Sequence, residues 1–171
     1  MRKFAIALLL FFSALTLYAS ANPFFVFSGK SYIQRGVLTI NEQEIAFTIY
    51  VVSTPEKIKM IMETQAGRMA RIELDSYGKV IVCEGGKLFQ KRFVESFVLP
   101  NFRAIMGFTK YLDNPLLYLK NASVCEIEHN CTLIKFGEMS VNNSAQALPK
   151  IEIISPKYKA EFNFVSQISN K

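Results

Sequence analysis

Residues 44–75, EIAFTIYVVSTPEKIKMIMETQAGRMARIELD, contain three short runs in which the side chains alternate between an apolar face and a second face. This period of two is typical of β-strands, because successive side chains point to opposite sides of a strand. The segments Thr54-Pro55 and Gln65-Ala66-Gly67 separate the runs as turns. Parallel strands need longer connections, so these short turns predict an antiparallel meander. The runs are residues 44–52, 57–64 and 68–75.

Similar patterns extend this sheet along the chain. The turn signals Ser76-Tyr77-Gly78 and Glu84-Gly85-Gly86 predict further strands at residues 79–83 and 87–93. Near the C-terminus, two strands are expected after a hairpin and a polar stretch. The hairpin is residues 123–136, the polar stretch is residues 142–146, and the strands are residues 150–154 and 157–168.

The hydrophobic period changes after Pro100. Phe102, Ile105, Met106, Phe108 and Leu112 fit one stripe of a helix. Asp113-Asn114-Pro115 has the form of a helix start, with an N-cap residue followed by proline, so residues 116–120 are expected to form a second short helix. Strands, a helical insertion and more strands together predict an α+β fold, with a curved antiparallel sheet and the helices on one face.

The apolar face of the predicted sheet is rich in phenylalanine and methionine, and the helical insertion is its natural cover. Methionine adapts its shape, so this face suits a flexible acyl chain. The same stripe is also what an ordinary packed core requires, and the sequence leaves both interpretations open. The candidate ligand-binding residues are Phe47, Ile49, Met60, Met62, Ile72, Leu74, Phe102, Ile105, Met106, Phe162 and Phe164.

The first 21 residues, MRKFAIALLLFFSALTLYASA, have the pattern of a secretory signal peptide. Arg2 and Lys3 precede an apolar run, and Ala19-Ser20-Ala21 offers small residues at a cleavage site. The run is too short for a convincing membrane anchor, and no cysteine follows it as a lipidation site. We therefore expect residues 1–21 to be a signal peptide and residues 22–171 to form a single exported domain.

The charge pattern argues against nucleic-acid binding. The whole chain carries +6, and removing Arg2 and Lys3 from its 20 basic residues leaves +4. The basic residues are scattered, whereas a nucleic-acid footprint needs them clustered on one face. Mild basicity favours transient contact with anionic lipid surfaces, although a net charge of this size also simply promotes solubility.

The stretch SVCEIEHNCTLIKF, residues 123–136, brings Cys125, His129 and Cys131 close together in sequence. Structural zinc sites need four ligands, usually as two separated pairs, and the only other cysteine is Cys83, in a strand expected to be buried. Cysteines of equal parity face the same side of a hairpin, and exported chains meet an oxidising compartment. A disulfide between Cys125 and Cys131 is the favoured prediction, with zinc binding and free thiols as alternatives. Cys125 and Cys131 would then lie opposite each other across a turn near residues 127–129, and His129 is expected to be solvated at the hairpin tip.

Catalysis is not predicted. His129 is the only histidine available as a base, and no nucleophile or metalloprotease motif is present in the sequence. The paired strand carboxylates, such as Glu126 and Glu128, are expected to be ordinary exposed side chains. No cofactor is expected either.

The order of elements resembles LolB-like domains of the bacterial lipoprotein-localisation (LolA/LolB) superfamily. Residues 36–92, with METQAGRMARIEL and GGKL, resemble the N-terminal half of these domains. VLPNFRAIMGFTKYLDNPLLYLK, residues 98–120, is similar to their covering helices, and LPKIEIISPKYKAEFNFVSQI, residues 148–168, is similar to their final strands. The resemblance implies an incomplete antiparallel barrel, closed by helices, with an apolar cavity for lipid acyl chains.

The resemblance also implies a carrier of lipids or lipoproteins in the periplasm of a Gram-negative bacterium, without catalysis. Two departures point away from a lipoprotein receptor: the chain lacks the lipidated cysteine, and Ala66 stands where the receptor has an exposed leucine. The alternative function is a cell-envelope interaction module that uses the same sheet as a docking surface for another protein.

Overall fold

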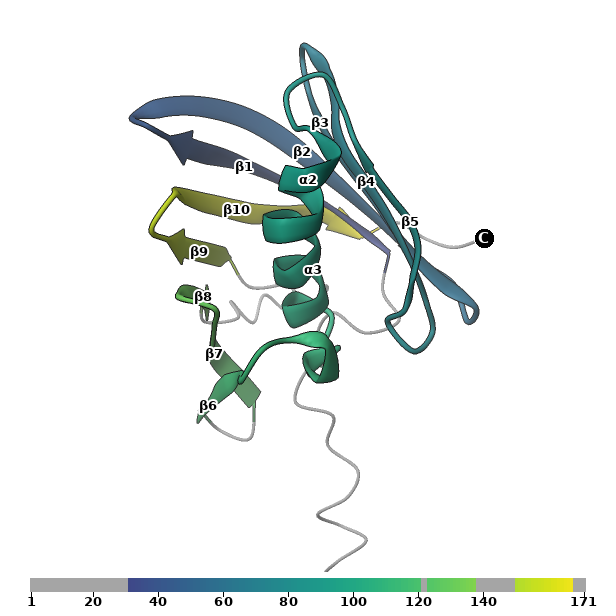
Figure 1. Ribbon diagram of the computed structural model, residues 1–171, viewed down its shortest axis with the longest axis vertical. Helices are drawn as coiled ribbons and strands as arrows, with labels where there is room; N and C mark the ends of the chain where they lie inside the picture. The colour runs from purple at the N-terminus through teal and green to yellow at the C-terminus, as the bar shows by residue number, and fades with distance from the viewer. Residues whose placement is uncertain (1–30, 121–122, 138–149, 168–171) are drawn as a thin grey trace, which may run out of the picture.

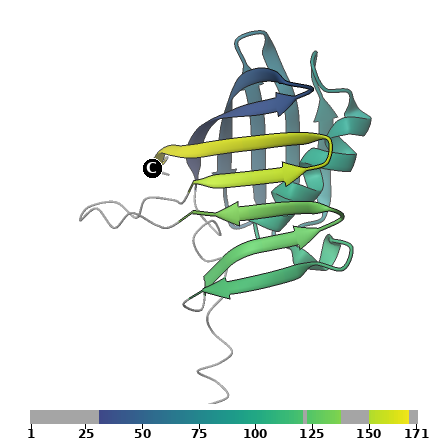
Figure 2. The ribbon, with the colours of Figure 1, turned by 90° about the vertical axis from the view of Figure 1, so that its left-hand side faces the viewer.

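The computed structural model describes residues 31–120, 123–137 and 150–167, which form a curved antiparallel sheet with a helical segment on one face (Figure 1, Figure 2). The predicted α+β class is confirmed. The predicted signal peptide and the polar stretch at residues 142–146 lie outside the described residues. The strands are β1 (Tyr32–Ile40), β2 (Gln43–Ser53), β3 (Lys57–Thr64), β4 (Gly67–Asp75), β5 (Val80–Gly85), β6 (Leu116–Lys120), β7 (Ser123–His129), β8 (Thr132–Phe136), β9 (Ile151–Ser155) and β10 (Tyr158–Gln167).

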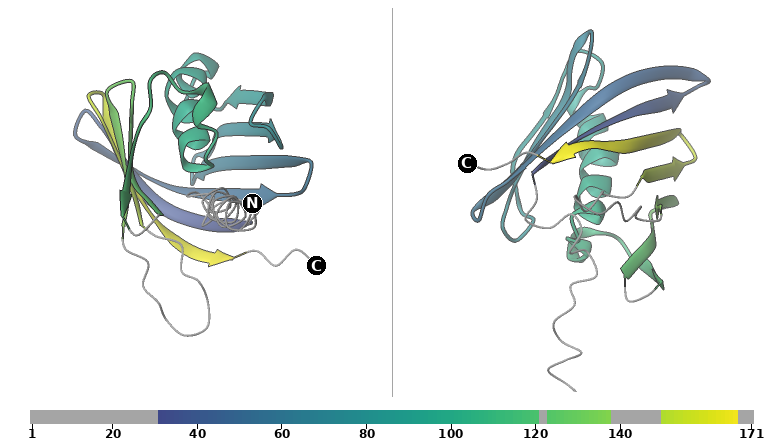
Figure 3. Two further views of the ribbon diagram at one scale, coloured as in Figure 1. Left: turned by 90° about the horizontal axis from the view of Figure 1, so that it is seen from below. Right: turned by 180° about the vertical axis from the view of Figure 1, so that it is seen from behind.

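The first five strands run from the middle of the sheet to one edge, and the last five run from the opposite edge back to the middle. Its strand order is β5-β4-β3-β2-β1-β10-β9-β8-β7-β6, and all neighbours are antiparallel. The meander predicted from residues 44–75 is confirmed as β2, β3 and β4. The two edge strands, β5 and β6, are consecutive in the chain, so the connection between them crosses the open side of the curve. Seen from below, the helical segment lies inside that curve (Figure 3).

The helical segment begins earlier than the sequence predicts. Residues 87–93 are not a strand: a short loop follows β5, and helix α2 (Lys91–Phe93) continues through the π-helical turn η1 (Val94–Val98) into α3 (Leu99–Ile105). Pro100 cannot donate a backbone hydrogen bond and its ring crowds the preceding turn. The wider turn η1 lies directly before it and accommodates the proline without ending the helix.

The predicted second helix at residues 116–120 is wrong, because this segment is the edge strand β6. Asn114 has φ +44°, a left-handed conformation, whereas a helix N-cap residue has an extended backbone. Beyond Pro115, the chain pairs with β7, with Leu117 opposite Ile127. Tertiary pairing therefore overrides the local helix-start signal. A single turn of 3₁₀-helix, η2 (Thr109–Tyr111), precedes this strand.

The hairpin at residues 123–136 is confirmed, but its turn lies later than predicted. Asn130 and Cys131 form the turn with φ of +45° and +58°, typical of a two-residue type I′ connection. His129 then pairs with Thr132, so Cys131 belongs to the turn and is not opposite Cys125. The premise of the disulfide prediction is therefore wrong, and Cys83, Cys125 and Cys131 are free thiols in the structure.

The interior lies between the concave face of the sheet and the helical segment. Phe47, Met60, Met62 and Ile72 are buried, as strand parity predicts. Gly36 of β1 pairs with Phe47 and therefore lies on the same inner face. A Cβ at this position would lie 2.2 Å from the carbonyl oxygen of Glu161 in β10, so only glycine fits here. Among the described residues, no helix has the length and hydrophobicity needed to cross a membrane.

Candidate ligand-binding cavity

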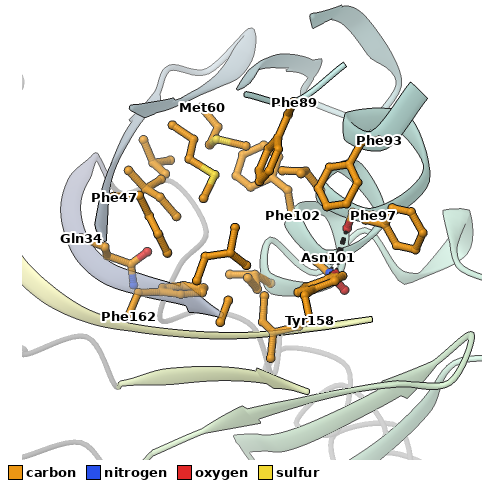
Figure 4. Close-up of a pocket in the computed structure, with 18 residues that line it drawn as sticks. Gln34, Phe47, Met60, Phe89, Phe93, Phe97, Asn101, Phe102, Tyr158 and Phe162 are labelled. Carbon is orange, nitrogen blue, oxygen red and sulfur yellow. Dashed lines mark hydrogen bonds between the residues drawn. The ribbon is translucent and has the colours of Figure 1, made fainter. Parts of the chain in front are cut away.

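A cavity of about 70 Å³ lies between the sheet and the helical segment (Figure 4). Strands β1, β2, β3, β9 and β10 form one wall, and the loop after β5 with the helical segment forms the other. Its lining is apolar except for three neutral polar side chains, and none of the described lining residues is charged. The lining residues are Gln34, Leu38, Phe47, Ile49, Val51, Met60, Met62, Phe89, Phe93, Phe97, Val98, Asn101, Phe102, Ile105, Ile153, Tyr158, Ala160 and Phe162.

The helical wall is a stack of aromatic rings. Phe89, Phe93 and Phe97 recur every fourth residue, with Phe89 in the loop before the helical segment and Phe93 and Phe97 within it. The ring centroids of Phe89 and Phe93 are 4.4 Å apart, and those of Phe93 and Phe97 are 4.9 Å apart. Tyr158 of β10 contacts the end of this stack, with its centroid 5.9 Å from that of Phe97. The stack therefore joins the cover to the sheet.

The sheet wall combines rigid rings with flexible chains. Phe47 and Phe162 pack edge to face, with their centroids 6.0 Å apart. Met60 and Met62 project from β3 beside them. Unbranched thioether side chains change rotamer more readily than β-branched ones, so this part of the wall can adapt to a ligand's shape.

A buried polar network closes one end of the cavity. Asn101 Nδ2 donates to the carbonyl oxygen of Phe97 at 2.8 Å and to the hydroxyl of Tyr158. His129 Nε2 lies 3.0 Å from Asn101 Oδ1, and since this oxygen can only accept, the imidazole donates through Nε2. Burial raises the pKa of Tyr158 to about 12. The network thus ties α3 to β7 and β10.

The prediction that His129 is solvated is wrong. The side chain is 4% exposed, because the turn begins after it and its ring faces α3. Loss of hydration lowers the pKa of His129, and the charge of Asp113 opposes this effect. The imidazole has a structural hydrogen bond and lies in no group of three or more potential metal ligands among the described residues.

The predicted ligand-binding residues divide into three groups. Seven line the cavity: Phe47, Ile49, Met60, Met62, Phe102, Ile105 and Phe162. Ile72, Leu74 and Met106 are buried in the core without lining it. The side chain of Phe164 lies outside what the structure describes, although its backbone pairs with Gln34 in β1.

The aromatic stack was not predicted, because residues 87–93 were expected to form a strand. The four-residue recurrence of Phe89, Phe93 and Phe97 was the available signal. Gln34 and Asn101 were not predicted as lining residues either. No local pattern marks these two residues, because they come together with the cavity only in the folded chain.

A second, more polar pocket of about 310 Å³ lies on the other side of the network. The turns between β7 and β8 and between β9 and β10 contribute to it. Phe97, Asn101 and Tyr158 line both spaces and form the partition between them. Typical ligand pockets measure about 300–1,000 Å³, so the inner cavity alone is smaller than most. Movement of the partition would connect the two spaces.

Comparisons with known proteins identify no close relative. No family model matches the chain, and no curated protein matches it. Among solved structures, the chain is similar to a LolA superfamily protein from Nitrosomonas europaea, with 8% sequence identity and a TM-score of 0.48 over 85% of this chain and 87% of that one. A likeness at this identity and TM-score carries no conclusion about function.

Proposed function

We propose that this protein binds a lipid acyl chain between its curved sheet and the helical segment, and acts as a carrier without catalysis. The observation that carries the proposal is the apolar cavity beneath the cover, whose described lining contains no charged side chain. Moving hydrocarbon surface from water into such a space is favourable, by about 25 cal/mol per Å² of buried surface.

Binding requires the cover to move, since the inner cavity measures about 70 Å³. The partition of Phe97, Asn101 and Tyr158 separates it from the outer pocket of about 310 Å³. A shift of the helical segment away from β10 would open the partition and join the spaces. The methionines of β3 would then adapt to the chain that enters.

We propose that the protein works after export, in the periplasm of a Gram-negative bacterium, and moves lipids or the acyl chains of lipoproteins between membranes. The pattern of residues 1–21 supports export, and the resemblance of residues 36–92, 98–120 and 148–168 to LolB-like domains supports the cargo class. The runner-up, a protein-docking module that uses the same sheet face, is less favoured because the helical segment covers that face (Figure 3).

The proposal is tested by what the purified protein retains. Native mass spectrometry and lipid extraction should reveal bound lipid, and a neutral apolar dye such as N-phenyl-1-naphthylamine should compete with it. Ala160 lines the cavity, so Ala160→Leu should fill space and weaken dye binding by about tenfold, equivalent to about 1.4 kcal/mol. Val165→Leu, on the exposed part of the same strand, is the matched control. A wild-type protein that carries no lipid and binds no dye would refute the proposal.

A further inference from the structure

Gln34 is the unusual residue of the cavity wall. It lies in the cavity wall (Figure 4), where its backbone pairs with Ile49 of β2 and Phe164 of β10, and it is 1% exposed although glutamine is normally a surface residue. The register between β1 and β10 shifts between Ile33 and Gln34, where β10 has one extra residue, Val165. Irregularities of this kind are frequent beside functional sites.

The side-chain amide of Gln34 has an unused donor. Its Nε2 is buried and has no hydrogen-bond partner among the described residues. The other two polar lining residues differ in this respect, because Asn101 and Tyr158 are hydrogen-bonded to each other and to the backbone of Phe97. A buried donor without an acceptor destabilises the fold, so such groups are rare in native proteins and call for an explanation.

We propose that Gln34 Nε2 donates a hydrogen bond to a neutral carbonyl oxygen of the bound ligand, so that the cavity selects ester- or amide-linked acyl chains. This inference rests on the proposed function and specifies its ligand class. A carbonyl oxygen only accepts, and it therefore matches an unpaired donor without introducing a further group that needs a partner. The hydrocarbon on either side of the carbonyl meets phenylalanine and methionine.

The lining favours a neutral oxygen over a carboxylate. None of the described cavity-lining residues is charged, and Arg35 is exposed on the opposite face of β1. A carboxylate buried beside Gln34 would lack a cation, and an uncompensated buried charge is strongly unfavourable. Free fatty acids in their ionised form should therefore bind less well than esters of the same chain length.

The test compares three probes of matched length, methyl dodecanoate, tetradecane and the dodecanoate ion at pH 8, by displacement of N-phenyl-1-naphthylamine. The ester-to-alkane preference is the ratio of the two affinities in each protein, because the alkane leaves water more readily than the ester whichever variant binds it. Gln34→Met keeps the size of the side chain and removes the donor, so it should reduce the ester-to-alkane preference by about three- to tenfold. Gln43→Met, at the exposed start of β2, is the matched control and should leave the preference unchanged.

Nuclear magnetic resonance of the wild-type protein gives a second readout that does not depend on the folding of a variant. The side-chain amide protons of Gln34 should shift downfield with methyl dodecanoate and not with tetradecane. An unchanged preference in Gln34→Met, tighter binding of the dodecanoate ion than of the ester, or no amide shift would each overturn the inference. Those outcomes leave acyl-chain binding intact, whereas failure of the wild-type protein to bind any of the probes would overturn the proposed function as well.

Discussion

Replacing Asn101 by leucine should destabilise the protein by about 2–5 kcal/mol, since the residue is the centre of the buried polar network. Leucine has nearly the same size and makes none of the three hydrogen bonds of the asparagine. Each such bond contributes about 0.5–1.5 kcal/mol, and a buried donor left without an acceptor costs about 1–3 kcal/mol. Tyr158 keeps a contact with the carbonyl oxygen of Phe97 at 3.5 Å, so the unpaired group would be His129 Nε2.

Urea unfolding followed by far-ultraviolet circular dichroism measures this loss. Asn163→Leu is the matched control, because Asn163 is exposed on β10, and it should change the free energy of unfolding by less than about 0.5 kcal/mol. In a His129→Phe background, Asn101→Leu should cost about 1–2 kcal/mol less, because no imidazole is left unpaired. A loss below about 1 kcal/mol for Asn101→Leu, or an additive double-mutant cycle, would refute the assigned network.

Two further predictions concern pH and packing. Burial lowers the pKa of His129 in the folded protein, so as pH falls the imidazole is protonated in the unfolded chain before it is protonated in the folded one. The free energy of unfolding should therefore be highest above the ordinary pKa of 6.5 and should decrease as pH falls below that value. Urea midpoints between pH 5 and 8 measure this, and His129→Gln should flatten the profile; an equally steep profile in that variant would assign the effect to other groups. Gly36→Ala should cost about 1–3 kcal/mol, because the new Cβ meets β10 backbone. Gly137→Ala, whose Cβ has ordinary contacts at 3.4 Å, is its control, and equal thermal melting temperatures of the two variants would contradict the prediction.

The strands were predictable where one face is buried and the turns are short. The alternation in residues 44–75 placed Phe47, Met60 and Ile72 on the inner face, as observed. The prediction failed for residues 87–93 and 116–120, where local signals are ambiguous. The first segment is a loop that leads into α2, where Phe93 packs between Phe89 and Phe97, and the second is a strand because β7 offers it hydrogen-bonding partners.

The sheet wall of the cavity was predictable from strand parity, and the helical wall was not. Parity identified the sheet residues that face inward, but it did not distinguish Met62, which lines the cavity, from Leu74, which packs in the core. That difference depends on where the helical segment crosses the sheet. His129 shows the same limit, because a shift of the turn by two residues changes a solvated ring into a buried one.

The sequence by itself determined the strand faces of the meander, the α+β class and the apolar character of the interior. These follow from local periodicity and turn chemistry, which act over a few residues. Only the tertiary structure decided that β10 pairs with β1, that the cover crosses from β5 to β6, and that Gln34 is buried with an unused donor. Such features depend on contacts between segments far apart in the chain, and no local pattern encodes which distant groups will meet.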